Sequence, residues 1–323
     1  MTMYEVLKSF PEQFAKGLEL ARGFKLEGRF DSVIISGMGG SALPGELVKA
    51  YLYDLKIPIH INRDYFLPSF ANNKSFIVVC SYSGNTEETL SVFEECIKRD
   101  LNFVVVASGG RLETLCRQKK IHCIKIPSGI QPRCATGYFF SSIIGLLSNS
   151  GIIPDKKKEI IRMAGFIKSL DLETEGKTLA KRLVGKIPVV YASEKYKPVA
   201  MIWKIKFNEN SKAMAFYNCF PELNHNEMNG YVKSGLQGRF FNIILRDSND
   251  NSMVNKRMDI TSGIIKSAGG ESEIIDMRGK STLDKMFSAL YLGDWVSYYL
   301  ALGYGVDPEK VELVERLKKM IAK

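Results

Sequence analysis

Short runs of apolar, mostly β-branched residues alternate with stretches of helical periodicity along the first half of this chain. Each run has the length of a buried strand, and a polar or glycine-containing segment follows it. The runs are DSVIISG (31–37), IPIHIN (57–62), SFIVVCSYS (75–83), NFVVVAS (102–108) and HCIKIPS (122–128). Strands and helices in steady alternation favour a mostly parallel sheet with helices on both faces. The pattern therefore predicts an α/β unit built as a three-layer sandwich.

The second half of the sequence repeats this order loosely. Its expected strands are IPVVYAS (187–193), FFNIILRD (240–247) and SEIIDMRG (272–279), and a long apolar helix follows the last of them. A chain of 323 residues has room for about two domains of roughly 150 residues each. We predict an N-terminal domain over 1–153. The C-terminal domain, 154–323, would begin with a lysine-rich helical linker over 154–186 and end in a C-terminal helix.

The net charge of +10 suggests an anionic partner. The basic residues are scattered, however, and their two modest concentrations, DKKKEIIRM and ERLKKMIAK, lack the interleaved aromatic residues of a nucleic-acid surface. Solvated helix faces, with some steering of phosphorylated small molecules, are the simpler interpretation. We therefore expect no nucleic-acid partner.

No segment of the sequence has the pattern of a membrane helix or a metal site. The N-terminal MTMYEVLKSFPEQF has amphipathic helical periodicity rather than a signal-peptide pattern. The most apolar segments are interrupted by serine or by Asp294. The six cysteines form no C-x-x-C pair and have no histidine at ligand spacing, which is typical of reduced thiols. We expect a soluble, cytoplasmic protein that needs no metal and no other cofactor.

The loop after the first strand, SGMGGSALPG (36–45), is rich in glycine. Glycines allow the backbone to approach an anion closely, and the helix that follows offers free N–H groups and its positive dipole end. Gly39, Gly40 and Ser41 are therefore candidates for binding a phosphorylated ligand. The loop also fits the dinucleotide fingerprint G-x-G-x-x-A with an acidic residue roughly 20 positions on. The matching residues are Gly37, Gly39, Ala42 and Asp64.

A second loop, SYSGNTEET (81–89), places three hydroxyl groups and a glycine between a strand and a helix. Hydroxyls together with helix N-terminal amides can hold a phosphate dianion without a lysine or a metal. Ser81, Ser83 and Thr86 are the candidate ligands. The alternative is an ordinary helix cap at Thr86, but a cap needs only one hydroxyl. The three hydroxyls favour phosphate binding.

The chain has three histidines, and one of them stands apart. His60 and His122 alternate with isoleucine, as strand residues at a sheet edge do. His225, in PELNHNEMNGY (221–231), lies between two asparagines in a polar segment that no hydrophobic core would favour. This setting raises the possibility of a chemical role, because histidine can move a proton near neutral pH.

These segments resemble a known family. SYSGNTEET is similar to the phosphosugar-binding loop of sugar isomerase (SIS) domains, and GMGGSALPGE, PSGIQPRCATGY and NENSKAMAFYNCFPELNHNEMNGY together resemble the bifunctional phosphoglucose/phosphomannose isomerases. The resemblance covers nearly the whole chain. It implies two SIS-type α/β units, and an enzyme that interconverts glucose 6-phosphate and mannose 6-phosphate with fructose 6-phosphate by ring opening and a cis-enediol(ate) intermediate.

The resemblance also implies roles for particular residues. Glu209, in KFNENSKAM, matches the base that moves the proton between C1 and C2, although alone it would be interpreted as a solvated acid at a helix end. His225 matches the ring-opening histidine, which the family contributes across a homodimer interface. Arg133 matches the arginine that stabilises the enediolate; its alternative is a surface salt bridge. Lys318 is our choice for a lysine near the sugar ring, with the adjacent Lys319 as the alternative.

Three other functions are compatible with parts of the sequence. A SIS-type regulator that binds a sugar phosphate without converting it would keep the hydroxyl loop but would not need Glu209 and His225 together. An amino-sugar isomerase of the glucosamine-6-phosphate synthase type would carry an N-terminal glutaminase domain with a catalytic cysteine at residue one or two, whereas this sequence begins MTMYEV. A dehydrogenase would leave the second loop unexplained.

Overall fold

A computed structural model of the protein describes residues 1–232 and 235–321. The chain divides into two compact units, Met1–Lys168 and Ser169–Lys323. Each unit contains one parallel sheet between helices, so the α/β architecture and the two-fold repetition are as the sequence predicts.

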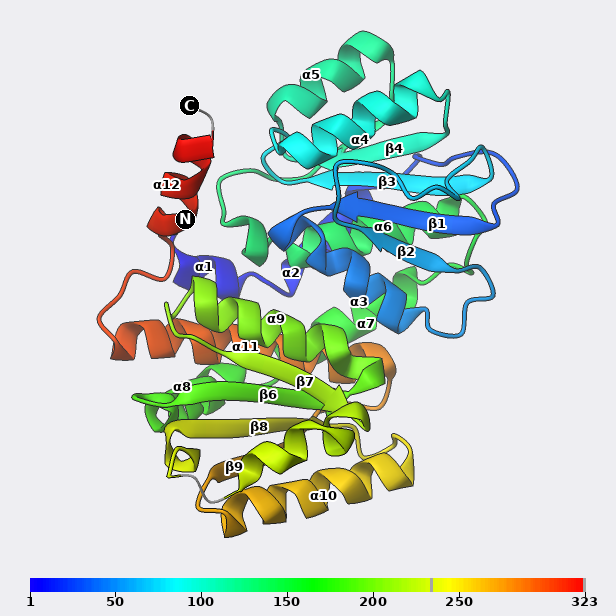
Figure 1. Ribbon diagram of the computed structural model, residues 1–323. Coiled ribbons are helices and arrows are strands. Elements are labelled where there is room, and N and C mark those ends of the chain that lie inside the picture. Colours follow the sequence, from blue (N-terminus) through cyan, green and yellow to red (C-terminus); the bar gives the residue numbers. More distant parts are fainter. Residues whose placement is uncertain (233–234, 322–323) are drawn as a thin grey trace. The chain divides into compact units, whose positions relative to one another are not determined.

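The sheet of the first unit has the strand order β2-β1-β3-β4-β5, with every neighbouring pair parallel (Figure 1). Its strands are β1 (Ser32–Gly37), β2 (Ile59–Asn62), β3 (Ser75–Ser81), β4 (Phe103–Ala107) and β5 (Cys123–Lys125). Every residue of the central strands β1, β3 and β4 is buried, which explains their continuous apolar sequences. His60 lies in the edge strand β2 and packs against Phe70, while His122 precedes the edge strand β5 and packs against Phe24.

Helices cover both faces of this sheet (Figure 1). On one face, α4 and α5 share a hydrophobic cluster with β1, β3 and β4 that includes Ile34, Phe93 and Leu112. On the other face α3 packs so closely that a Cβ added at Gly45 would lie 2.9 Å from the Ile35 side chain. The helices are α3 (Leu43–Tyr51), α4 (Glu87–Lys98), α5 (Gly110–Lys119) and α6 (Thr136–Asn149). Helix α6 lies against α3 and against α2 (Glu12–Leu20), the second helix of the chain.

The first unit extends past residue 153, the end of the domain expected from the sequence. Helix α7 (Lys157–Lys168) belongs to it and packs against α2 (Glu12–Leu20). The Tyr51 hydroxyl donates to Glu159 at 2.8 Å, and Lys168 pairs with Glu12 at 3.0 Å. The lysine-rich stretch is therefore divided between the units.

The N-terminal amphipathic segment is also two helices, α1 (Met3–Lys8) and α2, because Pro11 occupies the N-cap of the second.

The sheet of the second unit is parallel and has the order β7-β6-β8-β9. Its strands are β6 (Ile187–Ser193), β7 (Phe216–Phe220), β8 (Phe240–Arg246) and β9 (Glu271–Asp276). All of these except β7 were expected from the sequence. This edge strand reads FYNCF, and only its last two residues are buried, so it lacks the apolar run of the central strands.

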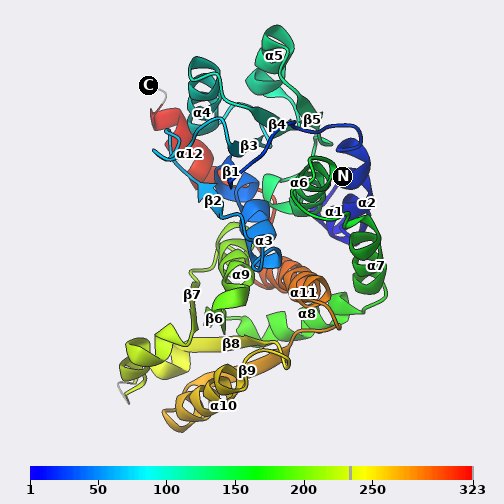
Figure 2. The ribbon, with the colours of Figure 1, turned by 90° about the vertical axis from the view of Figure 1, so that its right-hand side faces the viewer.

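Helix α10 (Ser252–Ser267) covers one face of this second sheet, whereas α8 (Leu172–Leu183), α9 (Lys197–Glu209) and α11 (Thr282–Gly303) cover the other (Figure 2). The two central helices α9 and α11 are in intimate contact, since the Trp203 indole donates to the Ala289 carbonyl at 2.9 Å and lies over Gly293. The last described helix is α12 (Glu312–Ile321). Among the described residues, none of the helices combines the length and the hydropathy needed to cross a bilayer.

Candidate active site

The two loops singled out from the sequence lie side by side at the carboxyl edge of the first sheet, because β1 and β3 are neighbouring strands. Their backbones are tied together, as the Tyr82 N–H donates to the Ser41 hydroxyl at 2.9 Å. Ser41 ends the short 3-10 helix η1 (Gly39–Ser41) and is only 6% exposed. Its hydroxyl therefore joins the two loops.

The hydroxyl loop forms a compact turn. Ser81 is fully buried, and its hydroxyl donates to Thr86 Oγ1 at 3.1 Å while accepting from the Gly84 N–H at 3.1 Å. Thr86 occupies the N-cap position of α4, but its side chain makes no capping hydrogen bond. The capping alternative therefore does not describe this loop. Ser83 is exposed at the tip, where its hydroxyl accepts from the Asn85 N–H at 3.2 Å.

A third turn, after β4, supports the hydroxyl loop, and the sequence analysis did not include it. Gly84 has φ +66°, and a Cβ there would lie 1.8 Å from the Gly109 carbonyl oxygen. Gly110, with φ +73°, approaches the Ser83 carbonyl in the same manner. The Asn85 side chain accepts from the Arg111 N–H at 2.9 Å. The glycine pair in ASGGR was the available signal, because two adjacent glycines after a strand mark a close backbone approach.

Arg133 joins the same edge from a distant part of the sequence. It lies in the 3-10 helix η2 (Pro132–Cys134), and a Cβ on Gly40 would be 2.8 Å from the Arg133 backbone nitrogen. Glycine is thus required at position 40 for the two segments to pack. Arg133 is only 2% exposed, which does not fit the surface salt bridge considered from the sequence. Its guanidinium donates to Gln131 at 3.4 Å.

A buried glutamine holds the segment that carries Arg133. Gln13, on α2, donates to the Cys134 carbonyl at 2.7 Å and accepts from the Gly137 N–H at 3.1 Å. These bonds satisfy backbone groups at the start of α6. Glutamine in an N-terminal helix gives no local indication of such a role, so the sequence analysis missed it. In the first unit the structure therefore brings together all seven predicted residues. They are Gly39, Gly40, Ser41, Ser81, Ser83, Thr86 and Arg133.

In the second unit Glu209 is the last residue of α9. It lines a pocket of about 590 Å³ together with the segment 212–214, the segment 306–307 and the start of α12. Lys212, which has φ +55°, folds back so that its ammonium donates to the carbonyls of Glu209 at 2.8 Å and of Asp307 at 2.7 Å. The helix end that presents Glu209 is therefore capped by a cation, which also opposes the negative end of the helix dipole.

Buried polar groups fix this helix end against α11. The Asn210 amide donates to the Ser297 hydroxyl at 2.9 Å, and the Ser211 hydroxyl donates to the Ser297 carbonyl at 2.7 Å. One turn before Glu209, Lys206 forms an ion pair with Asp294, and both side chains are 1% exposed. A buried charge of this kind must keep its partner, so the pair locks α9 to α11 close to Glu209.

His225 ends the 3-10 helix η4 (Glu222–His225) and is exposed. The next helical turn, η5 (Glu227–Tyr231), is attached to the sheet through Glu227, which accepts from the Tyr191 hydroxyl and the Asn218 amide. Burial raises the pKa of Tyr231 to about 12, although its hydrogen bond with Tyr191 lowers it. Tyr231 is thus protonated at neutral pH and donates to Asn242 at 2.8 Å. The exposed histidine therefore rests on a well-anchored segment.

Lys318 lies on α12, where it pairs with Glu315 at 2.9 Å and is largely exposed. Nothing in this arrangement distinguishes it from Lys319 for a role near the sugar ring. The apolar side chains of the same helix are exposed as well; they are Leu313, Val314, Leu317, Met320 and Ile321.

Four relatives that are 33–38% identical to this chain share one description. A bifunctional phosphoglucose/phosphomannose isomerase of Caldicellulosiruptor bescii is 37% identical over 99% of both chains, and one of Thermoplasma acidophilum is 38% identical over 91% of both. This chain belongs to the bifunctional phosphoglucose/phosphomannose isomerase family. A family model described as the bacterial phospho-glucose isomerase C-terminal SIS domain matches residues 172–321, which is the second unit.

Two further matches are more distant from this chain in sequence. A D-glucosamine-6-phosphate 4-epimerase of Sulfolobus acidocaldarius is 28% identical over 90% of this chain and 89% of its own. Among solved structures, a hypothetical protein from Thermus thermophilus superposes with a TM-score of 0.76 over 98% of this chain and 89% of that one, at 14% identity. The structural match shows a shared fold, and the epimerase shows that a related sequence carries a different activity on a sugar phosphate.

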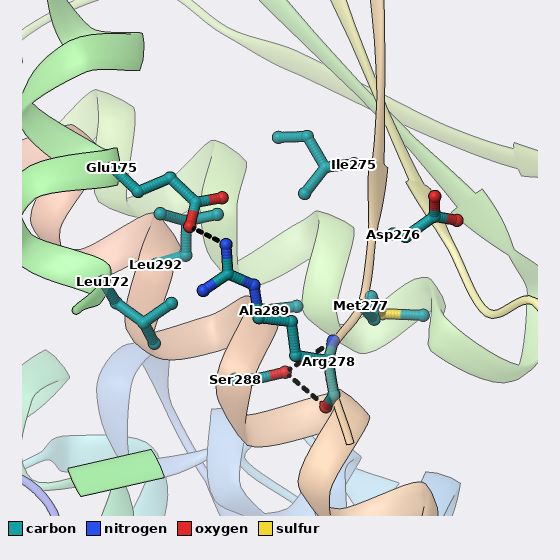
Figure 3. Close-up of a pocket in the computed structure, with 9 residues that line it drawn as sticks. All are labelled: Leu172, Glu175, Ile275, Asp276, Met277, Arg278, Ser288, Ala289 and Leu292. Atoms are coloured by element: carbon teal, nitrogen blue, oxygen red, sulfur yellow. Dashed lines mark hydrogen bonds and ion pairs between the residues drawn. The ribbon is translucent and has the colours of Figure 1, made fainter. Parts of the chain in front are cut away.

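The carboxyl edge of the second sheet is packed in a different way from that of the first. Asp247, directly after β8, pairs with Lys285, and both are 4% exposed. The pKa of Asp247 is lowered: burial would raise it, but hydrogen bonds, the first of them from Lys285, outweigh that effect. A nearby cavity after β9 has a volume of about 10 Å³ and is bordered by the Arg278–Glu175 pair (Figure 3). It holds at most about one water, so it is no sugar site.

Proposed function

We propose that this member of the family interconverts glucose 6-phosphate and mannose 6-phosphate with fructose 6-phosphate in the cytoplasm, without a metal or another cofactor. The observation that carries the proposal is Glu209, a carboxylate that a capped and buried helix end presents to a pocket of about 590 Å³. That volume lies in the range of small-molecule sites, about 300–1,000 Å³. A regulator that only binds its ligand would have no need for a carboxylate held in this manner.

In the proposed reaction His225 moves the proton that opens the sugar ring. Glu209 then removes the proton from C2 of the open aldose as the carbonyl electrons move to O1. A proton passes from the O2 hydroxyl to O1, and Glu209 returns a proton to C1 as the C2 carbonyl forms, which gives the ketose. The Arg133 guanidinium stabilises the negative charge of the enediolate. Rotation about the C2–C3 bond exposes the other face of the same intermediate, which accounts for both glucose and mannose 6-phosphate as products.

The phosphate is proposed to bind at the carboxyl edge of the first sheet. The exposed Ser83 hydroxyl, the Thr86 hydroxyl and the uncapped start of α4 are the groups that would contact it. Ser41 and the buried Ser81 would support the phosphate site without contacting the phosphate. Their hydroxyls already accept hydrogen bonds from backbone N–H groups of the loop.

Replacing Ser83 by alanine should therefore raise KM for fructose 6-phosphate, while the unfolding midpoint stays close to that of the wild type. One lost hydrogen bond to a charged group costs about 1.5–3 kcal/mol, or roughly tenfold to a hundredfold in KM. Steady-state kinetics measures this. Thr178→Ala, which removes an exposed hydroxyl from α8, should leave KM unchanged. A wild-type KM in Ser83→Ala would show that the phosphate binds elsewhere.

We further propose that the enzyme is a homodimer in which each subunit supplies His225 to its partner's site. Two observations support this. His225 is exposed rather than packed in its own unit. The exposed apolar side chains of α12 would be buried if a partner subunit packed on them. Such packing would also stabilise this helix of ten residues, because isolated helices shorter than about 12–15 residues are only marginally stable in water.

Mixing two inactive variants tests the shared site. Glu209→Gln and His225→Ala homodimers should each be nearly inactive, and subunit exchange between them should restore activity through heterodimers that contain one intact site. Mass spectrometry of the mixture verifies the exchange. If verified heterodimers remain inactive, each chain builds its own site and the proposal is wrong.

A further inference from the structure

The segment that carries His225 is fastened to the protein on both sides of the histidine. Upstream, Leu223 is fully buried and the Asn224 amide donates to Thr261 Oγ1 of α10 at 2.9 Å. Downstream, the first side chain that reaches the sheet is Glu227, two residues later. Asn226, between them, bonds within its own segment, to Glu222 and to the Glu227 N–H.

Glu227 connects three separate elements. One carboxylate oxygen accepts from the Tyr191 hydroxyl of β6, and the other accepts from the Asn218 amide of β7. Tyr231, at the end of η5, contacts the Tyr191 hydroxyl and donates to Asn242 of β8 at 2.8 Å. The Asn242 amide donates in turn to the Glu271 carbonyl of β9 at 2.9 Å, which fixes its orientation. Both oxygens of Glu227 thus accept hydrogen bonds from the protein itself.

The imidazole of His225, by contrast, has no hydrogen-bond partner among residues 1–232 and 235–321. Its position therefore depends on the backbone of its segment and not on a hydrogen bond of its own. That backbone is held by Leu223 and Asn224 on one side and by the carboxylate network on the other. Loss of Glu227 would move the downstream attachment of the histidine segment to Met228, which packs against the core of the second unit, and to Tyr231, which donates to Asn242.

We propose that Glu227 is a positioning residue that holds His225 for ring opening. This inference rests on the proposed function and names one of its parts. Glu227 touches neither the sugar nor the reacting atoms. It acts by fixing the backbone on which the imidazole stands, because a proton-transfer group must be held in hydrogen-bonding reach of its substrate to be effective.

Glu227→Gln is the informative substitution, since it keeps the shape but removes the charge and one of the two oxygens that accept from the Tyr191 hydroxyl and the Asn218 amide. We expect kcat on fructose 6-phosphate to fall at least about tenfold, and by no more than the roughly 10²–10⁴-fold that complete loss of a proton transfer costs, with a smaller change in KM. Tyr191→Phe should act in the same direction. Glu222→Gln is the matched control, because that carboxylate lies on the same segment and, within residues 1–232 and 235–321, accepts a side-chain hydrogen bond from Asn226 alone.

Two readouts separate positioning from a general loss of structure. An aldotetrose 4-phosphate has no free hydroxyl that can close a stable ring, so its isomerisation needs the base but not ring opening; Glu227→Gln should convert it at the wild-type rate. The protein has three histidines, so the His225 imidazole can be assigned in a proton NMR spectrum with a His225→Asn variant. In Glu227→Gln that resonance should shift or broaden while those of His60 and His122 remain unchanged.

Equal losses on the hexose and tetrose substrates, full hexose activity in Glu227→Gln, or an unaltered His225 resonance would each overturn the inference. Failure of the proposed function is distinguishable from these outcomes. In that case the wild type itself converts neither substrate, while the NMR comparison still reports whether Glu227 holds His225.

Discussion

Replacing Glu209 by glutamine should lower kcat for both glucose 6-phosphate and mannose 6-phosphate formation by about 10²–10⁴-fold or more. General-base catalysis typically contributes this much, and the substitution removes the only group proposed to accept the C1/C2 proton. Both activities should fall together because one enediolate serves both products. Coupled assays that resolve the two aldose phosphates measure the change.

Two comparisons make this test specific. Glu312 lines the same pocket, so Glu312→Gln removes a carboxylate of equal charge that has no proposed role and should retain activity. Binding of 5-phosphoarabinonate, a sugar-acid inhibitor, should survive in Glu209→Gln because the phosphate loops are untouched. If Glu209→Gln still exchanges solvent deuterium into fructose 6-phosphate near the wild-type rate, the base is another residue.

The largest effect on stability should come from the buried ion pair behind Glu209. Asp294→Asn leaves the Lys206 ammonium buried without its counter-charge, and breaking such a pair costs about 3–5 kcal/mol. Urea unfolding followed by tryptophan fluorescence reports on the correct region, since Trp203 and Trp295 lie on the same two helices and are the two tryptophans of the chain.

A surface pair provides the control for this substitution. Lys197 and Glu194 are 3.1 Å apart, and their side chains are 49% and 65% exposed, so Glu194→Gln should cost no more than about 1 kcal/mol. Replacing both members of the buried pair, with Lys206→Met and Asp294→Leu, should recover much of the loss, because two apolar groups need no partner. A cost in Asp294→Asn no larger than in Glu194→Gln would show that the pair does not lock the two helices.

The sheets were predictable because their central strands are buried on both faces. The continuous apolar runs of β1, β3 and β4 are typical of central strands in a parallel sheet, and every residue in them is buried. The strand β7, at an edge and half exposed, carries tyrosine and asparagine and was missed. Helix α5 was missed for a similar reason, since only Leu112 and Cys116 of its ten residues are buried.

The candidate site was predictable only in its local parts. Hydroxyls and glycines after a strand indicate a phosphate loop from sequence alone, whereas the role of Glu209 came entirely from the resemblance. Supporting residues gave no signal, because their partners are remote in the chain. Gln13 holds the carbonyl of Cys134, and Glu227 holds a hydroxyl of Tyr191. Such pairs become visible only once the chain is folded.

The central claim is that this chain isomerises hexose 6-phosphates through an enediolate. The most direct measurement is to supply fructose 6-phosphate in deuterium oxide and to identify every product by NMR. The account predicts glucose 6-phosphate and mannose 6-phosphate, both labelled at C2. Three results would contradict this reaction. One is unchanged fructose 6-phosphate, and the second is aldose products without deuterium at C2 when the base exchanges fully with solvent. The third is a product inverted at C4, as the related epimerase would suggest.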